Sequence, residues 1–252
     1  MARFAFFPAK SSGFAIAAAM MAVGTLGAIA IATPAYAQKQ AKFSKEFLAA
    51  FQPIDEAIKG ENPDYAALRA QAEAAKDTVK TDDERFFYGS TMYTIGGKLN
   101  DVALQLEGMN MMLDSGKVPE ANVPQYTYVA GQLAFNSQDW ASARARFEKA
   151  IELGYEVEQA RALIARTYSE EGDFTAALQT VNDQINEQIA VGGAPDETLL
   201  KRGLTTAYNN DLFEDATNYS LMLVKYYPSA TTWADAVAIQ RNFGQWSDAE
   251  MI

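Results

Sequence analysis

The chain contains no cysteine and no histidine. Without cysteine it has no disulfide bond, no thiolate nucleophile and no attachment point for the N-terminal lipid of exported bacterial lipoproteins. Without histidine it lacks the commonest metal ligand and the side chain best suited to moving protons near neutral pH. No phosphate-binding loop or nucleophile motif is present either. We therefore expect a protein that is not an enzyme, with no catalytic residue, no metal site and no cofactor.

The chain also has fewer basic than acidic residues. It contains 21 lysines and arginines and 32 aspartates and glutamates, which gives a net charge of −11. Nucleic-acid binding needs a clustered basic surface that displaces counterions from phosphates, so we expect no nucleic-acid partner. The acidity is explained by solubility alone. Apolar residues make up 49% of the chain, which is enough to form a packed core in one or two domains.

The first 37 residues have the three parts of a secretory signal peptide. Arg3 and Lys10 precede a long uncharged, mostly apolar stretch, which ends in Ala35-Tyr36-Ala37. Small residues at the last and third-last positions are what a signal peptidase requires. We predict cleavage after Ala37, export to the periplasm and no membrane insertion of the mature chain. An uncleaved inner-membrane anchor is the alternative, since about 20 uncharged residues can span a bilayer.

The rest of the chain has helical patterning. Apolar residues recur at helical spacing, as in Phe47, Phe51 and Ile54, and no stretch alternates as a strand would. Within this pattern Thr81 precedes the acidic run Asp82-Asp83-Glu84. This arrangement predicts a helix N-cap with acidic residues in the first turn rather than a metal site. The sequence predicts an all-α fold.

A longer pattern repeats every 34 residues. Residues 131–155 align with the stretch that lies 34 positions further on, and several positions match in type. The matched pairs are Asp139 with Asp173, Trp140 with Phe174, Ala143 with Ala177, and Phe147 with Val181. Small residues at a helix crossing let two backbones approach, and large ones fill the neighbouring gaps. We therefore expect the alanines at crossings and the aromatic residues between paired helices.

On these residues the chain resembles the tetratricopeptide-repeat (TPR) family, whose period is 34 residues, and is similar to an exported bacterial member of it. The match is strongest in three units that place Trp140, Phe174 and Phe213 in one aromatic slot. Two weaker units place Tyr65 and Leu99 in the same slot. The resemblance implies a right-handed α-solenoid of antiparallel helix pairs, with about six repeats, the first two degenerate and the last incomplete.

The expected domain organisation follows from this alignment. Residues 1–37 are the signal peptide, 38–118 hold the degenerate repeats, and 119–252 hold the clearer ones. The sixth repeat contains Trp246 but stops at Ile252, before its second helix is complete. We expect from this that the natural chain continues beyond residue 252.

In TPR proteins the first helix of each repeat lines a groove that holds an extended peptide or a helix of the partner. The resemblance implies six partner-binding residues, namely Tyr128, Gln132, Arg166, Lys201, Arg202 and Tyr208. The three basic ones form a spot that suits a carboxylate of the partner. The alternative is that they are ordinary helix surface, paired with carboxylates four residues away.

The function expected from these features is a periplasmic scaffold that binds a protein or peptide partner in its concave groove. The alternative is an accessory repeat domain of a larger cell-envelope enzyme or assembly complex. Neither the partner nor the oligomeric state can be derived from the sequence.

Overall fold

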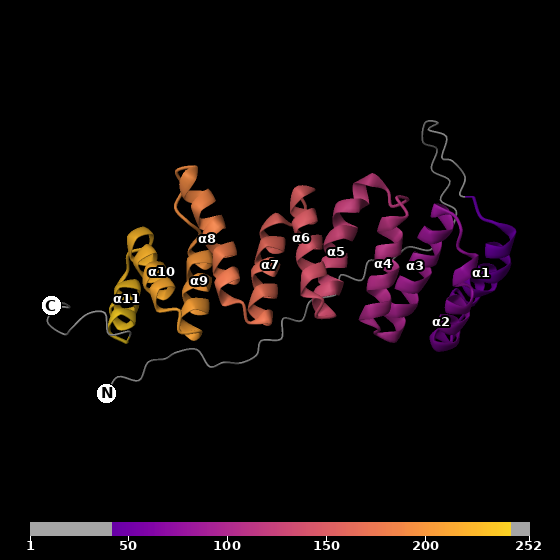
Figure 1. Cartoon of the computed structure of the whole chain (residues 1–252), viewed down its shortest axis with the longest axis horizontal. Coiled ribbons are helices and arrows are strands. Elements are labelled where there is room, and N and C mark those ends of the chain that lie inside the picture. Colours follow the sequence, from indigo (N-terminus) through magenta and orange to yellow (C-terminus); the bar gives the residue numbers. More distant parts are fainter. Residues whose placement is uncertain (1–41, 243–252) are drawn as a thin grey trace. The chain divides into compact units, whose positions relative to one another are not determined.

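Figure 1 shows the protein as a computed structural model, which describes residues 42–242. The predicted signal peptide and the end of the predicted sixth repeat lie outside the described residues. Residues 42–242 form eleven α-helices and two short 3-10 helices, without a β-strand, so the predicted all-α class is confirmed. The described residues belong to one compact unit, Ala41–Ile252.

The helices follow one another with short connections. They are α1 (Lys45–Ile58), α2 (Tyr65–Ala74), η1 (Lys76–Thr78), α3 (Asp82–Leu99), α4 (Val102–Asp114), η2 (Glu120–Asn122), α5 (Val123–Asn136), α6 (Trp140–Glu152), α7 (Val157–Glu171), α8 (Phe174–Ala190), α9 (Glu197–Asn209), α10 (Phe213–Tyr226) and α11 (Ala230–Asn242). From α3 onward, successive helices run alternately up and down in Figure 1. Each α-helix packs mainly on its neighbours in the sequence.

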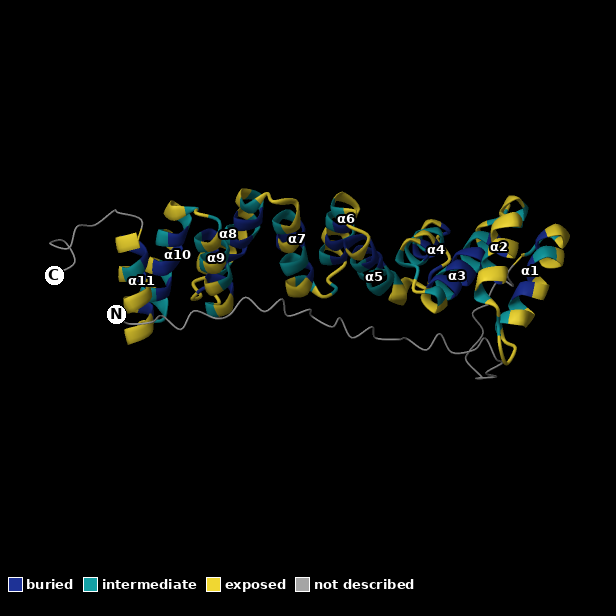
Figure 2. Ribbon diagram, turned by 90° about the horizontal axis from the view of Figure 1, so that it is seen from below, coloured by how far each residue is buried: buried dark blue, intermediate teal, exposed yellow. Residues whose placement is uncertain are grey.

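Side chains also link several helices to the next helix but one, and on these links we group the helices in two rows. In the odd-numbered row (α5, α7, α9, α11), the Arg166 guanidinium of α7 lies 4.9 Å from the centre of the Phe135 ring of α5. In the even-numbered row (α4, α6, α8, α10), Arg146 Nη2 of α6 donates to Asn110 Oδ1 of α4 at 2.8 Å. Figure 2 shows that most helices have buried residues along one side and exposed residues along another.

Four helix pairs, from α3–α4 to α9–α10, are joined by turns of one geometry. Each connection contains one residue with positive φ, two positions before the second helix begins. These residues are Asn100, Gln138, Gly172 and Asp211. The next residue donates its N–H to a carbonyl five positions back, as Asp139 does to Ala134 and Asp173 to Tyr168. In three of the four turns this donating residue is an aspartate, whose side chain also caps the second helix of the pair. The matched aspartates of the 34-residue pattern are therefore helix caps.

The second helix of the α3–α4 pair begins three residues later than the aromatic slot predicts. Leu99 is the last residue of α3, so its predicted place at the start of a second helix is wrong. Asn100 takes the left-handed conformation, and Asp101 Oδ1 accepts from Leu104 N at 2.9 Å, which starts α4 at Val102. The alignment placed the start of the helix at the aromatic slot, but the N-cap residue determines where this helix begins. Tyr65, by contrast, does start α2.

The predicted crossing residues lie where helices pack together. Ala143 and Ala177 are 0% and 2% exposed. Trp140 packs edge-on against Phe135 at 5.1 Å between ring centres, which fills the joined end of α5 and α6 as predicted. Phe213, in the same slot of the next-but-one pair, is 43% exposed. The aromatic slot therefore contributes unequally to packing from one helix pair to the next.

The first turn of α3 confirms the predicted N-cap. Thr81 Oγ1 accepts from Glu84 N, and the Glu84 carboxylate accepts in return from Thr81 N at 2.8 Å. The same carboxylate accepts from Lys80 N at 2.7 Å and from Ser44 N, just before α1, at 2.6 Å. Glu84 is fully buried. It therefore joins the starts of α1 and α3 as well as capping a helix.

Candidate functional site

The six residues predicted to bind a partner all lie on the odd-numbered row. Tyr128 and Gln132 belong to α5, Arg166 to α7, and Lys201, Arg202 and Tyr208 to α9. They differ in exposure, because Arg166 and Lys201 are exposed and the other four are partly buried. The predicted site therefore combines surface cations with side chains that also pack between helices.

Tyr128 is held by aromatic neighbours. Its ring lies 5.6 Å from that of Phe147 and 5.7 Å from that of Tyr155, measured between centres. Burial and then the negative charge of Glu156 raise the pKa of Tyr128, while a side-chain hydrogen bond with Gln132 opposes the rise. The structure thus brings Tyr128 and Gln132 together, with Tyr128 contributing to the packing of α5 and α6.

Arg166 and Lys201 each pair with a carboxylate four residues away. Arg166 Nε lies 3.2 Å from Glu170 Oε1, and Lys201 Nζ lies 2.8 Å from Glu197 Oε1. Exposed pairs of this kind contribute only about 0.3–0.5 kcal/mol, so a carboxylate of a partner could replace them at little cost. Within residues 42–242 no hydrogen bond or ion pair joins Arg166 to Lys201 or Arg202.

Arg202 and Tyr208 are less accessible than the two exposed cations. The Nε atom of Arg202 is buried and makes no hydrogen bond within the described part of the chain. Tyr208 packs against the core formed by α7 to α11, and its hydroxyl accepts from Asn242 Nδ2 of α11 at 3.4 Å. Tyr208 therefore links two successive helices of the odd-numbered row.

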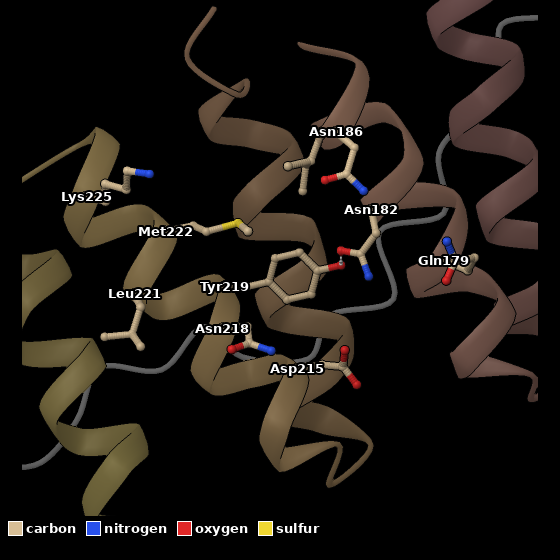
Figure 3. Close-up of a pocket in the computed structure, with 10 residues that line it drawn as sticks. Gln179, Asn182, Asn186, Asp215, Asn218, Tyr219, Leu221, Met222 and Lys225 are labelled. Atoms are coloured by element: carbon tan, nitrogen blue, oxygen red, sulfur yellow. Dashed lines mark hydrogen bonds between the residues drawn. The ribbon is translucent and has the colours of Figure 1, made fainter. Parts of the chain in front are cut away.

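The structure also contains a pocket that the sequence analysis missed. It has a volume of about 520 Å³ and lies between α8 and α10, in the even-numbered row (Figure 3). Its lining combines polar and apolar surface and consists of Gln179, Asn182, Ile185, Asn186, Asp215, Asn218, Tyr219, Leu221, Met222 and Lys225. We call this the amide pocket, after its four carboxamide side chains. The sequence signal for it was carboxamides at helical spacing along α8.

Tyr219 forms the floor of the amide pocket. Its ring is 2% exposed, and its hydroxyl donates to Asn182 Oδ1 at 2.7 Å. The ring lies against Gly203 of α9, where an added Cβ atom would collide with it. Burial and then the negative charge of Asp215 raise the pKa of Tyr219, so the phenol stays protonated and remains a donor. The Tyr219 ring therefore lies between Gly203 of α9 and the pocket.

Two further features bear on function. Among residues 42–242 no group of three or more acidic side chains is arranged to hold a metal ion. Nor does any helix in that range combine the length and the apolar character needed to cross a bilayer.

In comparisons with known proteins, no protein-family model matches the chain and no curated protein matches it.

Proposed function

We propose that this protein is a periplasmic interaction scaffold of TPR-like repeats that binds a peptide or helix of a partner protein along its odd-numbered row. In this proposal the helix pairs form a right-handed solenoid of about six repeats. Residues 1–37 act as a signal peptide that directs export to the periplasm and is cleaved off after Ala37. The proposed contact residues are the six on α5, α7 and α9 that the resemblance implies.

The observation that carries this proposal is the direct contact between successive odd-numbered helices. Arg166 of α7 lies over Phe135 of α5, and Asn242 of α11 bonds to Tyr208 of α9. Side-chain contacts thus join α5 to α7 and α9 to α11, across the boundaries between helix pairs, which supports binding of a ligand longer than one pair. The carboxylates that pair with Arg166 and Lys201 lie in the same helices and are exposed, so acidic groups of a partner can replace them at little cost.

Photo-crosslinking in the cells that make the protein would test this proposal. A benzophenone amino acid placed at Thr205, an exposed residue of α9, should give a discrete crosslinked species. The same group at Glu148, an exposed residue of α6, should not. The double change Arg166→Glu and Lys201→Glu should reduce the Thr205 crosslink about tenfold or more, because two charge-assisted contacts become repulsive.

The control is a second double variant with the same change in net charge. Lys98→Glu and Lys149→Glu alter exposed residues of α3 and α6, and the crosslink at Thr205 should persist. Equal crosslinking from Glu148 and Thr205, or equal loss in both double variants, would contradict a binding surface on the odd-numbered row.

A further inference from the structure

We propose that the amide pocket is a second binding site, which takes an extended peptide segment carrying one basic and one acidic residue about four positions apart. The pocket belongs to the even-numbered row, so this inference does not depend on the function proposed for the odd-numbered row. Three features carry it: the spacing of the carboxamides, the donor fixed by Tyr219, and the opposite charges at the two ends.

The first feature is the carboxamide spacing. Asn182 and Asn186 lie four residues apart on α8, which places them about 6 Å apart along the helix axis. In an extended peptide, equivalent backbone groups on every second residue are about 6.6 Å apart. A carboxamide offers one acceptor and two donors, which complement the C=O and N–H of a peptide unit. Successive amides on this wall therefore match alternate residues of an extended chain.

The second feature is the orientation of Asn182. Because the Tyr219 hydroxyl donates to Asn182 Oδ1, the amide nitrogen is left with its two N–H donors for a ligand. Across the pocket Asn218 is exposed, as is Asn186 on the wall of α8 (Figure 3). Neither of these two amides makes a hydrogen bond to any residue in the described range 42–242. Each wall therefore presents a carboxamide whose hydrogen-bonding groups remain available.

The third feature is the charge at each end. Asp215 and Lys225 both line the pocket from α10, and ten residues of helix separate them by about 15 Å along the axis. Neither forms an ion pair within residues 42–242, and Lys225 Nζ lies 4.8 Å from the centre of the Tyr226 ring. An extended chain covers that length in four to five residues, at about 3.3 Å each. A ligand that satisfies both ends carries a cation at one end and an anion at the other.

The lining disfavours two other classes of ligand. Tyr219 is the sole aromatic residue among the lining side chains, and its ring is too buried to stack on a sugar. Lys225 is the sole cation of the lining and is balanced by Asp215, so a polyphosphate or nucleic acid would meet no net positive charge. A peptide with balanced charge is the ligand that fits the lining.

The test uses the whole protein and four acetylated, amidated heptapeptides with alanine and serine at the other positions. Their second and sixth residues are lysine and glutamate, glutamate and lysine, two lysines, or two glutamates. Binding is followed by the side-chain amide signals of Asn182 and Asn186 in ¹H–¹⁵N NMR spectra. At least one mixed-charge peptide should shift these signals and bind about tenfold more tightly than both like-charged ones.

Variants separate the parts of the proposal. Asn186→Leu or Asn218→Leu should weaken binding about two- to tenfold each, whereas Gln71→Leu, an exposed amide on α2, should not. Lys225→Glu should turn the preference toward the peptide with two lysines. The Arg166→Glu, Lys201→Glu variant should bind as the unchanged protein does, which keeps this test separate from that of the odd-numbered row.

Several outcomes would overturn the inference. No shift with any peptide at millimolar concentration would do so, as would equal binding of all four peptides. An unchanged preference in the Lys225→Glu variant would remove the role of the charged ends. Shifts caused by a linear oligosaccharide or a single-stranded oligonucleotide, but by none of the peptides, would assign the pocket to a different ligand.

Discussion

Replacing Gly89 by alanine should destabilise the protein by roughly 1–3 kcal/mol, because α3 and α4 touch backbone to backbone at this point. A Cβ atom on Gly89 would lie 2.6 Å from the carbonyl oxygen of Gly108 and 2.9 Å from the amide nitrogen of Met112. A backbone atom cannot turn aside as a side chain does, so the two helices would have to separate. The loss exceeds the gain of up to about 1 kcal/mol that alanine brings to a helix.

Urea denaturation would measure this effect, as a lower midpoint with an unchanged m-value. Gly97→Ala is the matched control on the same helix. Gly97 is exposed, and the nearest atom to its added Cβ is Gln105 Oε1 at 3.9 Å. Alanine there should stabilise the protein by about 0.5 kcal/mol or slightly more. Equal effects at the two glycines would show that α3 and α4 do not approach as closely as described.

Glu84→Gln should cost about 3 kcal/mol at neutral pH. Burial alone would raise the pKa of Glu84, but backbone N–H groups of Ser44, Lys80 and Thr81 outweigh it and lower the pKa to about 2. The amide of glutamine has one oxygen fewer and would direct an N–H₂ group at backbone donors. Denaturant unfolding at pH 7 would measure the loss. Asp82→Asn, in the same helical turn but exposed, should change stability by less than about 0.5 kcal/mol.

The same carboxylate should make stability depend on pH. In the unfolded chain Glu84 has its ordinary pKa of 4.5, and in the folded protein its pKa falls to about 2. Because the folded-state pKa is the lower one, the stabilisation is fully present above pH 4.5 and is lost as the pH falls toward 2. The difference corresponds to about 3 kcal/mol. Glu84→Gln should therefore flatten the stability curve over this range, and an unchanged slope would contradict the assignment.

Features that depend on residues a few positions apart could be predicted from the sequence. The helical periodicity of α1 and the cap at Thr81 were predicted and are confirmed. The matched aspartates, Asp139 and Asp173, were noticed as part of the 34-residue pattern, and the structure shows them to be N-caps. Caps and periodicity involve contacts within one or two helical turns, so short stretches of sequence contain the information.

The candidate site was predictable only in part. The resemblance selected residues that all fall on the odd-numbered row, but which side chains they contact was not visible in the sequence. Tyr128 packs on Phe147 and Tyr155, and Arg202 has a buried Nε atom, so these two are less available than an alignment suggests. Their surroundings depend on how neighbouring helices pack, which no spacing within a single helix encodes.

By itself, then, the sequence determined the helical periodicity, the cap at Thr81 and the all-α class, because these depend on local periodicity and local hydrogen bonds. The tertiary structure decided what depends on residues far apart in the chain. It joined Glu84 to Ser44, 40 positions away, and set Tyr219 against Asn182, 37 positions away, which created the amide pocket. It also brought Gly89 against Gly108. Such contacts arise when whole helices pack, and the side chains of several elements fix them together.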